Sequence, residues 1–459
     1  MYEMLKDNKL EYIYRELKGN IARYISISPN MEIRYINISV DNNYSENLRE
    51  CIINLITISK TKSVNIRSFS TECMKGNELI YGKKIDNIDE IINLIETNCK
   101  NNKYSIVNET IDVNDGGVSG VVFGNIVEFA PNDTPKCVEK PDVCFLGKDM
   151  GFSILKTVYG FLPELNFDDE CRVEFSLHPQ REGILNVHTV IWEYEEYDKF
   201  KYDTRIQWPN RFSKFIGDKT FGLIVADYLG FNVPYTVVLS RNVPPFSFGK
   251  STGIYEKWIR TAPAVKEPGK FYTSDKWTDP FKLMNSEELK GDSDINIASI
   301  LSQSAVESMY SGGAIISETG DEDIIEGVKG KGDDFMLGTK QESTLPNDVV
   351  DKLKMVMDEL RKYNSIIGNV SIEWVYDGEK IWIVQLNQIE HLGGGKVIVH
   401  GNPSRYERFF VNLGLDKLRI KIEEIKDKNL GIELVGNVGV CSHFGDILRK
   451  SNIPSFISD

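Results

Sequence analysis

The sequence predicts a mixed α/β protein, of the α+β kind, with several packed domains. Apolar residues at helical spacing alternate along the chain with short runs rich in β-branched residues, a pattern typical of helices and strands that share a core. The chain has 459 residues, more than a single hydrophobic core usually organises. Length and pattern therefore favour a multidomain α/β architecture over an all-helical or all-strand one.

The helical segments have apolar residues three and four positions apart, and the strand segments are short and β-branched. Gly230 stands where a glycine commonly ends a helix. The expected helices are 45–59, 88–100, 220–230, 348–363 and 406–425. The expected strands are 118–129, 172–177, 187–196, 235–240 and the hairpin 370–387.

Composition excludes several classes of protein. Apolar residues at 41% and charged residues at 27% are ordinary for a globular chain and exclude a disordered or collagen-like one. The net charge of −14 argues against binding to nucleic acid. We expect no membrane span and no signal peptide, since no long apolar run occurs and the start is charged. Seven cysteines without a C-x-x-C pair favour free thiols, so the expected location is the cytoplasm.

Three short motifs recur in the same order in the two halves of the chain. Arg67, Ser119-Gly120 and Glu174 in the first half recur as Arg260, Ser311-Gly312 and Glu373 in the second. The steps are 52 and 55 residues in the first copy and 51 and 62 in the second. The pattern predicts an internal duplication.

The hairpin 370–387 carries a candidate metal site at Glu373 and Gln385. Carboxylate and amide oxygens are ligands for a hard cation such as Mg²⁺ when they share a face. A three-residue loop at 377–379 would place Glu373 opposite Ile383 and leave Gln385 as a diagonal neighbour at about 7 Å. The alternative is a surface hairpin with ordinary polar residues.

A second candidate is Lys219, which lies in a glycine-containing turn just before the helix 220–230. Free N–H groups and the dipole at a helix start favour phosphate, and the lysine adds its charge. The alternative for a lone Gly-x-Lys motif is a solvated loop.

The run GDK…FGLIVADYLGFNVP resembles the opening of the ATP-grasp domain in the pyruvate phosphate dikinase and phosphoenolpyruvate synthase family. WIRTAP at 258–263 is similar to that family's phosphate-binding V-R-S-S-A, and ILSQSAVESMYSGG at 300–313 resembles its adenine-pocket segment. GVKGKGDD at 327–334 looks like a shortened G-L-G-E turn, and SIEWVYDGEKIWIVQLN like D-I-E-W-x-x-D-G…Q-x-R-P.

This resemblance implies an ATP-grasp nucleotide-binding domain with ATP and Mg²⁺ as cofactors. It implies that Lys219 and Arg260 contact the phosphates and that Glu373 and Gln385 hold the metal. The remaining implied nucleotide-binding residues are Gln303, Ala305, Val306 and Asp333. Asn387 departs from the family pattern, because an arginine is expected there.

The final segment, GVCSHFGDILRKSNIPSF at 439–456, resembles the signature of the same family's swivelling phosphohistidine domain. The resemblance implies that His443 accepts a phosphoryl group. A neutral imidazole is a competent nucleophile, and the helix start after Ser442 would stabilise the phosphorylated form. The alternative is a structural histidine beside a capping serine.

The predicted organisation has three parts: a degenerate ATP-grasp-like or docking domain at 1–200, an ATP-grasp domain at 211–390 and a short swivelling-type α/β domain at 396–459. The amino-terminal part keeps Arg67 and Glu174, but Asn186 stands twelve residues after Glu174 in place of a glutamine.

The predicted function is ATP- and Mg²⁺-dependent phosphoryl transfer of the dikinase type, with His443, Lys219 and Arg260 as catalytic residues and an unknown small molecule or protein as acceptor. One alternative is an ATP-binding regulatory or scaffold protein that has lost catalysis. Another is an ATP-grasp ligase that forms an acyl phosphate, in which His443 has no role. No nucleic-acid or membrane partner is expected, and a homo-oligomer or a partner chain stays open.

Overall fold

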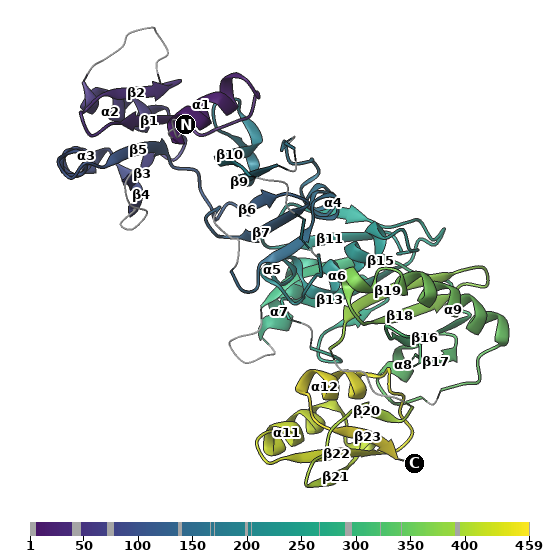
Figure 1. Cartoon of the computed structure of the whole chain (residues 1–459). Helices are drawn as coiled ribbons and strands as arrows, with labels where there is room; N and C mark the ends of the chain where they lie inside the picture. Colours follow the sequence, from purple (N-terminus) through teal and green to yellow (C-terminus); the bar gives the residue numbers. More distant parts are fainter. Residues whose placement is uncertain are drawn as a thin grey trace. The chain divides into compact units, whose positions relative to one another are not determined.

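The computed structural model describes residues 6–38, 47–70, 78–135, 140–165, 167–168, 170–197, 201–202, 204–265, 267–289, 296–321, 323–340, 342–390 and 395–458. They form two compact units, Met1–Lys140 with Leu162–Tyr202 (unit 1) and Pro141–Phe161 with Asp203–Asp459 (unit 2). Both units combine helices and sheets, which confirms the mixed α/β class (Figure 1). Among the described residues, no helix is long and apolar enough to cross a bilayer.

Unit 1 contains a five-stranded sheet of order β2-β1-β5-β3-β4. Helices α2 and α3 present apolar residues at helical spacing, and these pack with strand residues such as Ile66 and Val107 into one buried core. The elements are α1 (Lys6–Arg15), β1 (Tyr24–Ile27), β2 (Ile33–Ile36), α2 (Leu48–Ile58), β3 (Ser63–Phe69), β4 (Glu78–Lys84), α3 (Ile88–Lys100) and β5 (Tyr104–Glu109).

Unit 1 contributes the neighbouring strands β10-β9-β6-β7 to a second sheet. Helix α1 packs against β10. The strand expected at 118–129 is in fact two strands, because Gly124 takes a positive φ of 56° and turns the chain. The strands are β6 (Val118–Phe123), β7 (Ile126–Pro131), β9 (Cys171–Glu182) and β10 (Val187–Glu196).

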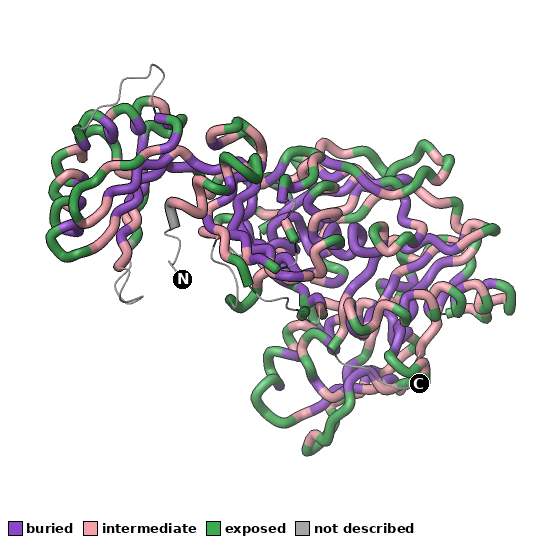
Figure 2. Tube along the Cα trace, turned by 45° about the horizontal axis from the view of Figure 1, so that its top comes forward, coloured by how far each residue is buried: buried purple, intermediate pink, exposed green. Residues whose placement is uncertain are grey.

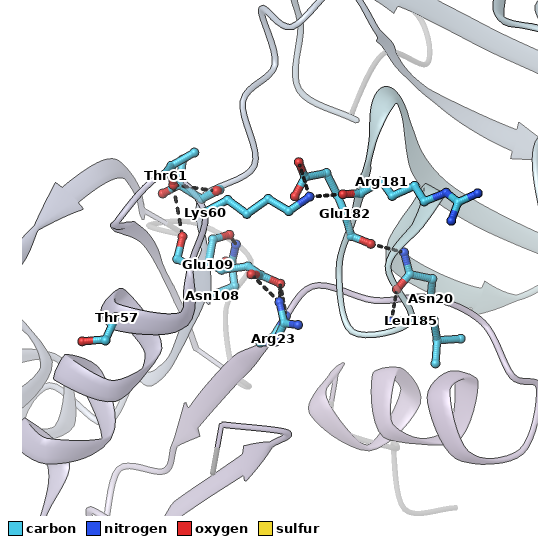
Figure 3. A network of polar contacts seen from close by, with 12 residues as sticks. Asn20, Arg23, Thr57, Lys60, Thr61, Asn108, Glu109, Arg181, Glu182 and Leu185 are labelled. Atoms are coloured by element: carbon cyan, nitrogen blue, oxygen red, sulfur yellow. Dashed lines mark hydrogen bonds and ion pairs between the residues drawn. The ribbon is translucent and has the colours of Figure 1, made fainter. Parts of the chain in front are cut away.

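A polar network joins the two sheets of unit 1 (Figure 3). Lys60, in the turn before β3, pairs with Glu182 at 3.2 Å. The side chain of Asn20 donates to the Glu182 carbonyl at 3.0 Å. Arg23 pairs with the buried carboxylate of Glu109 on β5 at 2.9 Å. These contacts hold the β9–β10 hairpin and the segment before β1 against the first sheet.

Unit 2 contains a five-stranded sheet of order β12-β11-β15-β13-β14. Its strands and helix are β11 (Thr236–Ser240), β12 (Phe246–Phe248), β13 (Lys257–Pro263), β14 (Thr273–Ser274), α7 (Pro280–Leu289) and β15 (Ile297–Ser304). Before it come β8 (Cys144–Gly147), α4 (Lys148–Tyr159), α5 (Arg211–Ile216) and α6 (Asp218–Tyr228). The helix expected at 220–230 is α6, which ends just before Gly230 at a φ of 90°.

The second sheet of unit 2 has the order β17-β16-β18-β19, and α6 packs on β19. Figure 2 shows that buried residues follow the strands, as expected for sheets covered by helices. The elements are β16 (Tyr310–Ile316), β17 (Ile324–Lys329), α8 (Asp333–Met336), α9 (Asn347–Arg361), α10 (Asn364–Ile367), β18 (Val370–Tyr376) and β19 (Ile381–Gln388).

The C-terminal part of unit 2 is a four-stranded sheet of order β20-β23-β22-β21, with β21, β22 and β23 parallel. The helix expected at 406–425 is wrong in its first third. That third forms β21, and Gly414, at a φ of 84°, separates it from the helix. The elements are β20 (Val397–Val399), β21 (Arg405–Phe410), α11 (Leu415–Ile425), β22 (Leu430–Val435), α12 (His443–Ser451) and β23 (Ser455–Ser458).

The two units repeat one topology. When the five strands of the first sheet are counted along the chain, their order across the sheet is second, first, fifth, third, fourth in both units. The four strands of unit 1 in the second sheet, counted along the chain, lie in the order fourth, third, first, second. The four strands of the second sheet of unit 2 have the same order when the sheet is read from β19. The helix before each first sheet, α1 or α6, packs on the last strand, β10 or β19. The sequence repeat is therefore matched by a repeat of the fold.

The recurring residues occupy equivalent strand positions. Arg67 on β3 pairs with Ile106, and Arg260 on β13 pairs with Leu301 on the corresponding strand. Glu174 and Glu373 are each the fourth residue of their strands, β9 and β18.

Asn186 stands twelve residues after Glu174 in the sequence, but it does not pair with Glu174. A bulge and a longer hairpin place Glu193 opposite Glu174 instead, as Gln385 lies opposite Glu373 in unit 2.

The three domain ranges expected from the sequence remain a prediction. The boundary between the units falls near residue 202, but 141–161 belongs to unit 2 because α4 packs against α6 and β12. The range 396–459 has its own sheet yet belongs to the same unit as 203–395.

Candidate functional site

An open pocket lies between the two large sheets of unit 2, and we name it pocket A. It holds about 720 Å³ of empty space, part of it open to solvent. Strands β13 and β15 form one wall, β16, β18 and β19 the other, and residues 331–336 line one side. The predicted site residues that line pocket A are Arg260, Gln303, Val306, Asp333 and Glu373.

Arg260 joins the two walls of pocket A. One guanidinium nitrogen donates to the carbonyl of Val384 at 2.6 Å and to Gln303 at 3.2 Å. The other donates to Glu373 at 3.1 Å and to Gln385 at 3.4 Å. A mostly buried guanidinium is thereby fixed at the point where β13, β15, β18 and β19 meet, next to a carboxylate. Such an oriented cation is suited to bind phosphate oxygens.

Glu373 and Gln385 share a face, but by a route that differs from the expected one. The loop has four residues, since Tyr376 pairs with Ile381, and an even loop alone would turn the two side chains to opposite faces. A β-bulge at Val384 adds one residue to β19 and restores the pairing, so Glu373 lies directly opposite Gln385. The expected diagonal arrangement is therefore wrong.

The glycine-rich segment 327–334 places polar residues at the open side of pocket A. Burial raises the pKa of Asp333 above the usual 3.8, and Glu373 acts in the same direction while Arg260 opposes it. The ammonium group of Lys331 lies 5.1 Å from the ring centre of Trp258. The segment therefore adds a second carboxylate and a second cation to the site.

The apolar wall of pocket A includes Trp374, which is fully buried. Its indole N–H has no hydrogen-bond partner among the described residues. A buried donor without a partner is costly, so this N–H is a group that a ligand-induced rearrangement of the wall could satisfy. On the adjoining strand end, Ser304 and Val306 line the pocket. Ala305, predicted to do so, instead directs its backbone N–H to Glu256 at 2.9 Å.

Lys219 is the second residue of α6 and is not among the residues that line pocket A. The preceding turn is closely packed, because a Cβ on Gly217 would come 2.9 Å from the Cβ of Ala262. Asp218, beside Lys219, lines another pocket described below. The structure thus brings together Arg260, Glu373 and Gln385, while the phosphate-binding role of Lys219 stays a prediction.

Two further pockets continue from the Glu373 end of pocket A. Pocket B, about 240 Å³, shares Glu373 and Met336 with pocket A and includes Cys441. Pocket C, about 1150 Å³, shares Arg449 and Asn387 with pocket B. Asn387, at the position where the family resemblance expects arginine, accepts from the Gln385 amide at 3.2 Å. Shared lining residues therefore connect all three pockets.

The C-terminal part docks closely on the second sheet of unit 2. The partly buried carboxylate of Glu326 on β17 accepts the backbone N–H groups of Val440 and Cys441 at 2.8 and 2.7 Å. Burial raises the pKa of Glu326 and of the Cys441 thiol, so the cysteine is not an activated nucleophile. A Cβ on Gly313 would come 2.6 Å from the Cβ of Cys441.

His443 is the first residue of α12, and Ser442 is its N-cap residue. Its Nδ1 lies 3.9 Å from a carboxylate oxygen of Asp446, which lines pockets B and C. Its ring is flanked by Gly269, where a Cβ would come 3.3 Å from the ring carbon Cδ2. His443 itself lines none of pockets A to C.

Sequence reasoning missed several residues of these pockets. Trp258 was not predicted as a site residue and Lys331 was predicted only as part of a turn, yet both line pocket A. The available signal was that Trp258 lies on the same strand as Arg260, and that Lys331 lies in the same glycine-rich segment as Asp333. Arg449 was not predicted as a site residue, and its place in pockets B and C depends on the docking of the C-terminal part.

No protein-family model and no curated protein matches the chain. Among solved structures, the macrocyclase MdnB from Microcystis aeruginosa is similar with 14% identity and a TM-score of 0.23, over 40% of this chain and 55% of that one. An ATP-grasp ligase from Chryseobacterium gregarium, solved with ADP and peptides, has 15% identity and a TM-score of 0.22, over 38% and 54%. D-alanine–D-alanine ligase from Bacillus anthracis, solved with ATP, has 11% identity and a TM-score of 0.22, over 43% and 55%.

This chain therefore covers little more than half the length of each of these proteins. Such TM-scores do not by themselves establish a shared fold.

Proposed function

We propose that pocket A binds ATP and that the protein is an ATP-dependent enzyme of the ATP-grasp kind, which passes the terminal phosphoryl group to an acceptor in pockets B and C. The observation that carries this proposal is the position of Arg260. It joins the two sheets at the Glu373 end of an otherwise partly apolar pocket, and the acceptor pockets begin at that end.

The residues of pocket A divide into two groups. Trp258, Val306 and Trp374 form an apolar and aromatic wall of the kind that binds a purine ring, and the buried, unpartnered indole N–H of Trp374 would reach an acceptor atom after a small movement of the wall. Arg260 and Lys331 are the cations that would meet the phosphates. Phosphoryl transfer depends mainly on such positioning and charge neutralisation.

The residues at the phosphate end fit a magnesium ion. Mg²⁺ is usually held by one or two protein carboxylates together with substrate phosphates, and Asp333 and Glu373 both line pocket A. Gln385, opposite Glu373, adds an amide oxygen. The ion would neutralise charge on the phosphates, and Arg260 would then exchange its ion pair with Glu373 for phosphate oxygens.

The acceptor that pockets B and C favour is a carboxylate. Arg449 lines both pockets and is mostly buried. Its guanidinium pairs with Asp446 at 2.9 Å and donates to the Val440 carbonyl at 3.0 Å, while its Nε–H has no hydrogen-bond partner among the described residues. A carboxylate oxygen placed there would attack the γ-phosphorus, the bond from that phosphorus to the β–γ bridging oxygen would break, and ADP would leave. An amine would then displace phosphate from the acyl phosphate and form an amide, the outcome of a ligase.

A second candidate is transfer to His443, as the dikinase resemblance implies. The observation that favours it is the contact of His443 with Asp446, a residue that lines pockets B and C. Access to the phosphorus would require the ring to move from its position beside Gly269. A third candidate is an ATP-binding regulatory protein without turnover.

One experiment distinguishes the three candidates. The full chain is incubated with Mg²⁺ and γ- or β-labelled ATP, with and without a panel of carboxylates and amines. For a ligase, ADP and phosphate appear only when both a carboxylate and an amine are present. Acid-labile, base-stable label on the protein that is lost in H443A would instead establish the histidine route, and binding without turnover would establish the regulatory role. Absence of ATP binding would refute the proposal itself.

The predicted role of Lys219 is tested by the substitution K219M in the same assay. Loss of ATP binding would support a phosphate contact. Binding equal to that of the wild type would restrict the phosphate cations to Arg260 and Lys331.

A further inference from the structure

Unit 1 contains a pocket of its own, which we name pocket D. It holds about 560 Å³ of empty space, part of it open to solvent, and lies between α1, β10 and the strands β1, β3 and β5. All of its lining residues belong to unit 1. None of them is used by the function proposed for unit 2.

Pocket D is the counterpart of pocket A in the repeated fold. The strand registers make Arg67 equivalent to Arg260, since these residues face Ile106 on β5 and Leu301 on β15. Two positions further along those partner strands, Asn108 is equivalent to Gln303. Both members of each pair line the pocket of their unit. The duplication therefore preserved a ligand-sized opening as well as a topology.

The chemistry of the two pockets differs at one strand. Glu193 stands where unit 2 has Gln385, and Trp192 stands where unit 2 has Val384. Glu193 pairs with Arg67 at 3.3 Å, so unit 1 carries a carboxylate at the position where unit 2 carries an uncharged amide. Arg260 also has one carboxylate partner, Glu373 at 3.1 Å, but in unit 1 the partner carboxylate stands on β10, next to Trp192.

The residue of unit 1 that is equivalent to the proposed metal ligand Glu373 has different contacts. Glu174, the equivalent of Glu373, is almost fully buried and pairs with Arg172 at 2.9 Å. It is not among the residues that line pocket D. The nucleotide and metal chemistry proposed for pocket A is therefore not repeated here.

The aromatic wall of pocket D is held in place from behind. The indole N–H of Trp192 donates to Ser176 Oγ at 2.7 Å, and the same oxygen lies 2.7 Å from His178 Nε2. His178 Nδ1 in turn lies 2.9 Å from Asp115. Ser176 and His178 are each at most 2% exposed, so this relay has no access to a substrate and serves to orient Trp192.

We propose that pocket D binds a free amino acid with an apolar side chain. Arg67 and Glu193 lie side by side and match the carboxylate and the ammonium group of a zwitterion, and Lys9 and Glu195 provide a second pair of opposite charges. Trp192 and Ile191 belong to the apolar part of the lining that would cover the side chain. The net charge of these four ionised groups is zero, as is that of the ligand. This site goes beyond the function proposed above and does not depend on it.

The test is a binding measurement on the full chain without nucleotide. Isothermal titration calorimetry is run with each common amino acid, and at least one with an apolar side chain is expected to bind. Binding of that amino acid is expected to change the fluorescence of Trp192. The matched variants E193Q and W192V insert the residues that unit 2 carries at these positions. Each is expected to weaken amino-acid binding about tenfold or more. Titration with ATP should be unaffected by either variant.

The proposal would be overturned if no amino acid binds, if amino-acid binding survives both variants, or if binding is lost in R260M but not in E193Q. Competition by AMP or ATP that depends on Arg67 would also overturn it, because it would assign pocket D to a nucleotide. The E193Q change is nearly isosteric, and an unchanged melting temperature will show that the variant is folded. Loss of ATP binding to pocket A alone would refute the proposed function and leave this inference standing.

Discussion

Replacing Arg260 with methionine removes the cation that joins the two walls of pocket A and retains most of the side-chain volume. One charge-assisted hydrogen bond contributes about 1.5–3 kcal/mol, so the loss of a single phosphate contact should weaken ATP binding about 10–150-fold. The same change removes the ion pair of Glu373, a side chain that is 16% exposed. We expect a loss of about 1–3 kcal/mol in the free energy of unfolding, or about 2–10 °C in melting temperature.

The assay is calorimetric titration of the full chain with ATP and Mg²⁺, with melting temperatures measured in parallel. The matched control is R67M, which removes the equivalent arginine of unit 1 and should leave ATP binding within twofold of the wild type. The double variant R260M/E373Q shows whether lost stability comes from the uncompensated carboxylate. If R260M binds ATP like the wild type, or if R67M weakens binding equally, the assignment of pocket A is refuted.

Three further predictions concern pocket A and the docked C-terminal part. W374F keeps an aromatic ring but removes the unpartnered indole N–H, so calorimetry should show ATP affinity about 5–10-fold lower; unchanged affinity would mean that the N–H meets only water. Because burial raises the pKa of Asp333 above 3.8, its carboxylate takes up a proton as pH falls through that raised value. MgATP binding should therefore weaken toward acidic pH, and D333N should flatten this part of the pH profile. G313A would place a Cβ 2.6 Å from the Cβ of Cys441 and should expose 436–458 to hydrogen exchange and lower stability by about 1–3 kcal/mol. The control is G147A, whose added Cβ would make only an ordinary contact with Thr204 Oγ1 at 3.9 Å.

Local sequence patterns were sufficient for most elements but not for every boundary. The helix expected at 220–230 and the strand expected at 187–196 are present as α6 and β10. The region 406–425 was predicted as one helix because its apolar spacing is helical, but parallel pairing of 405–410 with β22 and the turn at Gly414 make its first part a strand. Strand pairing depends on a partner distant in sequence, so local periodicity does not reveal it.

The repeated motifs allowed the duplication to be predicted, because residue identity at Arg67, Glu174, Arg260 and Glu373 is visible in the chain. The equivalence of Glu193 with Gln385 was not visible. The two hairpins differ in length, and a β-bulge in each shifts the register, so counting twelve residues from Glu174 led to the wrong residue. Loop lengths and bulge positions depend on how the two strands pair. They therefore do not follow from counting residues along the sequence.

The sequence by itself determined which chemical groups are available: an arginine, two carboxylates, an amide and aromatic residues on strands and turns of an α/β chain. The tertiary structure decided which of them meet. It brought Arg260, Glu373 and Gln385 together, kept Lys219 out of the lining of pocket A, and carried Arg449 from the C-terminal part into pockets B and C. The physical reason is that side chains distant in sequence meet only through sheet packing and strand register, which depend on many weak contacts over the whole chain. A sequence motif contains information only about residues close to it in the chain.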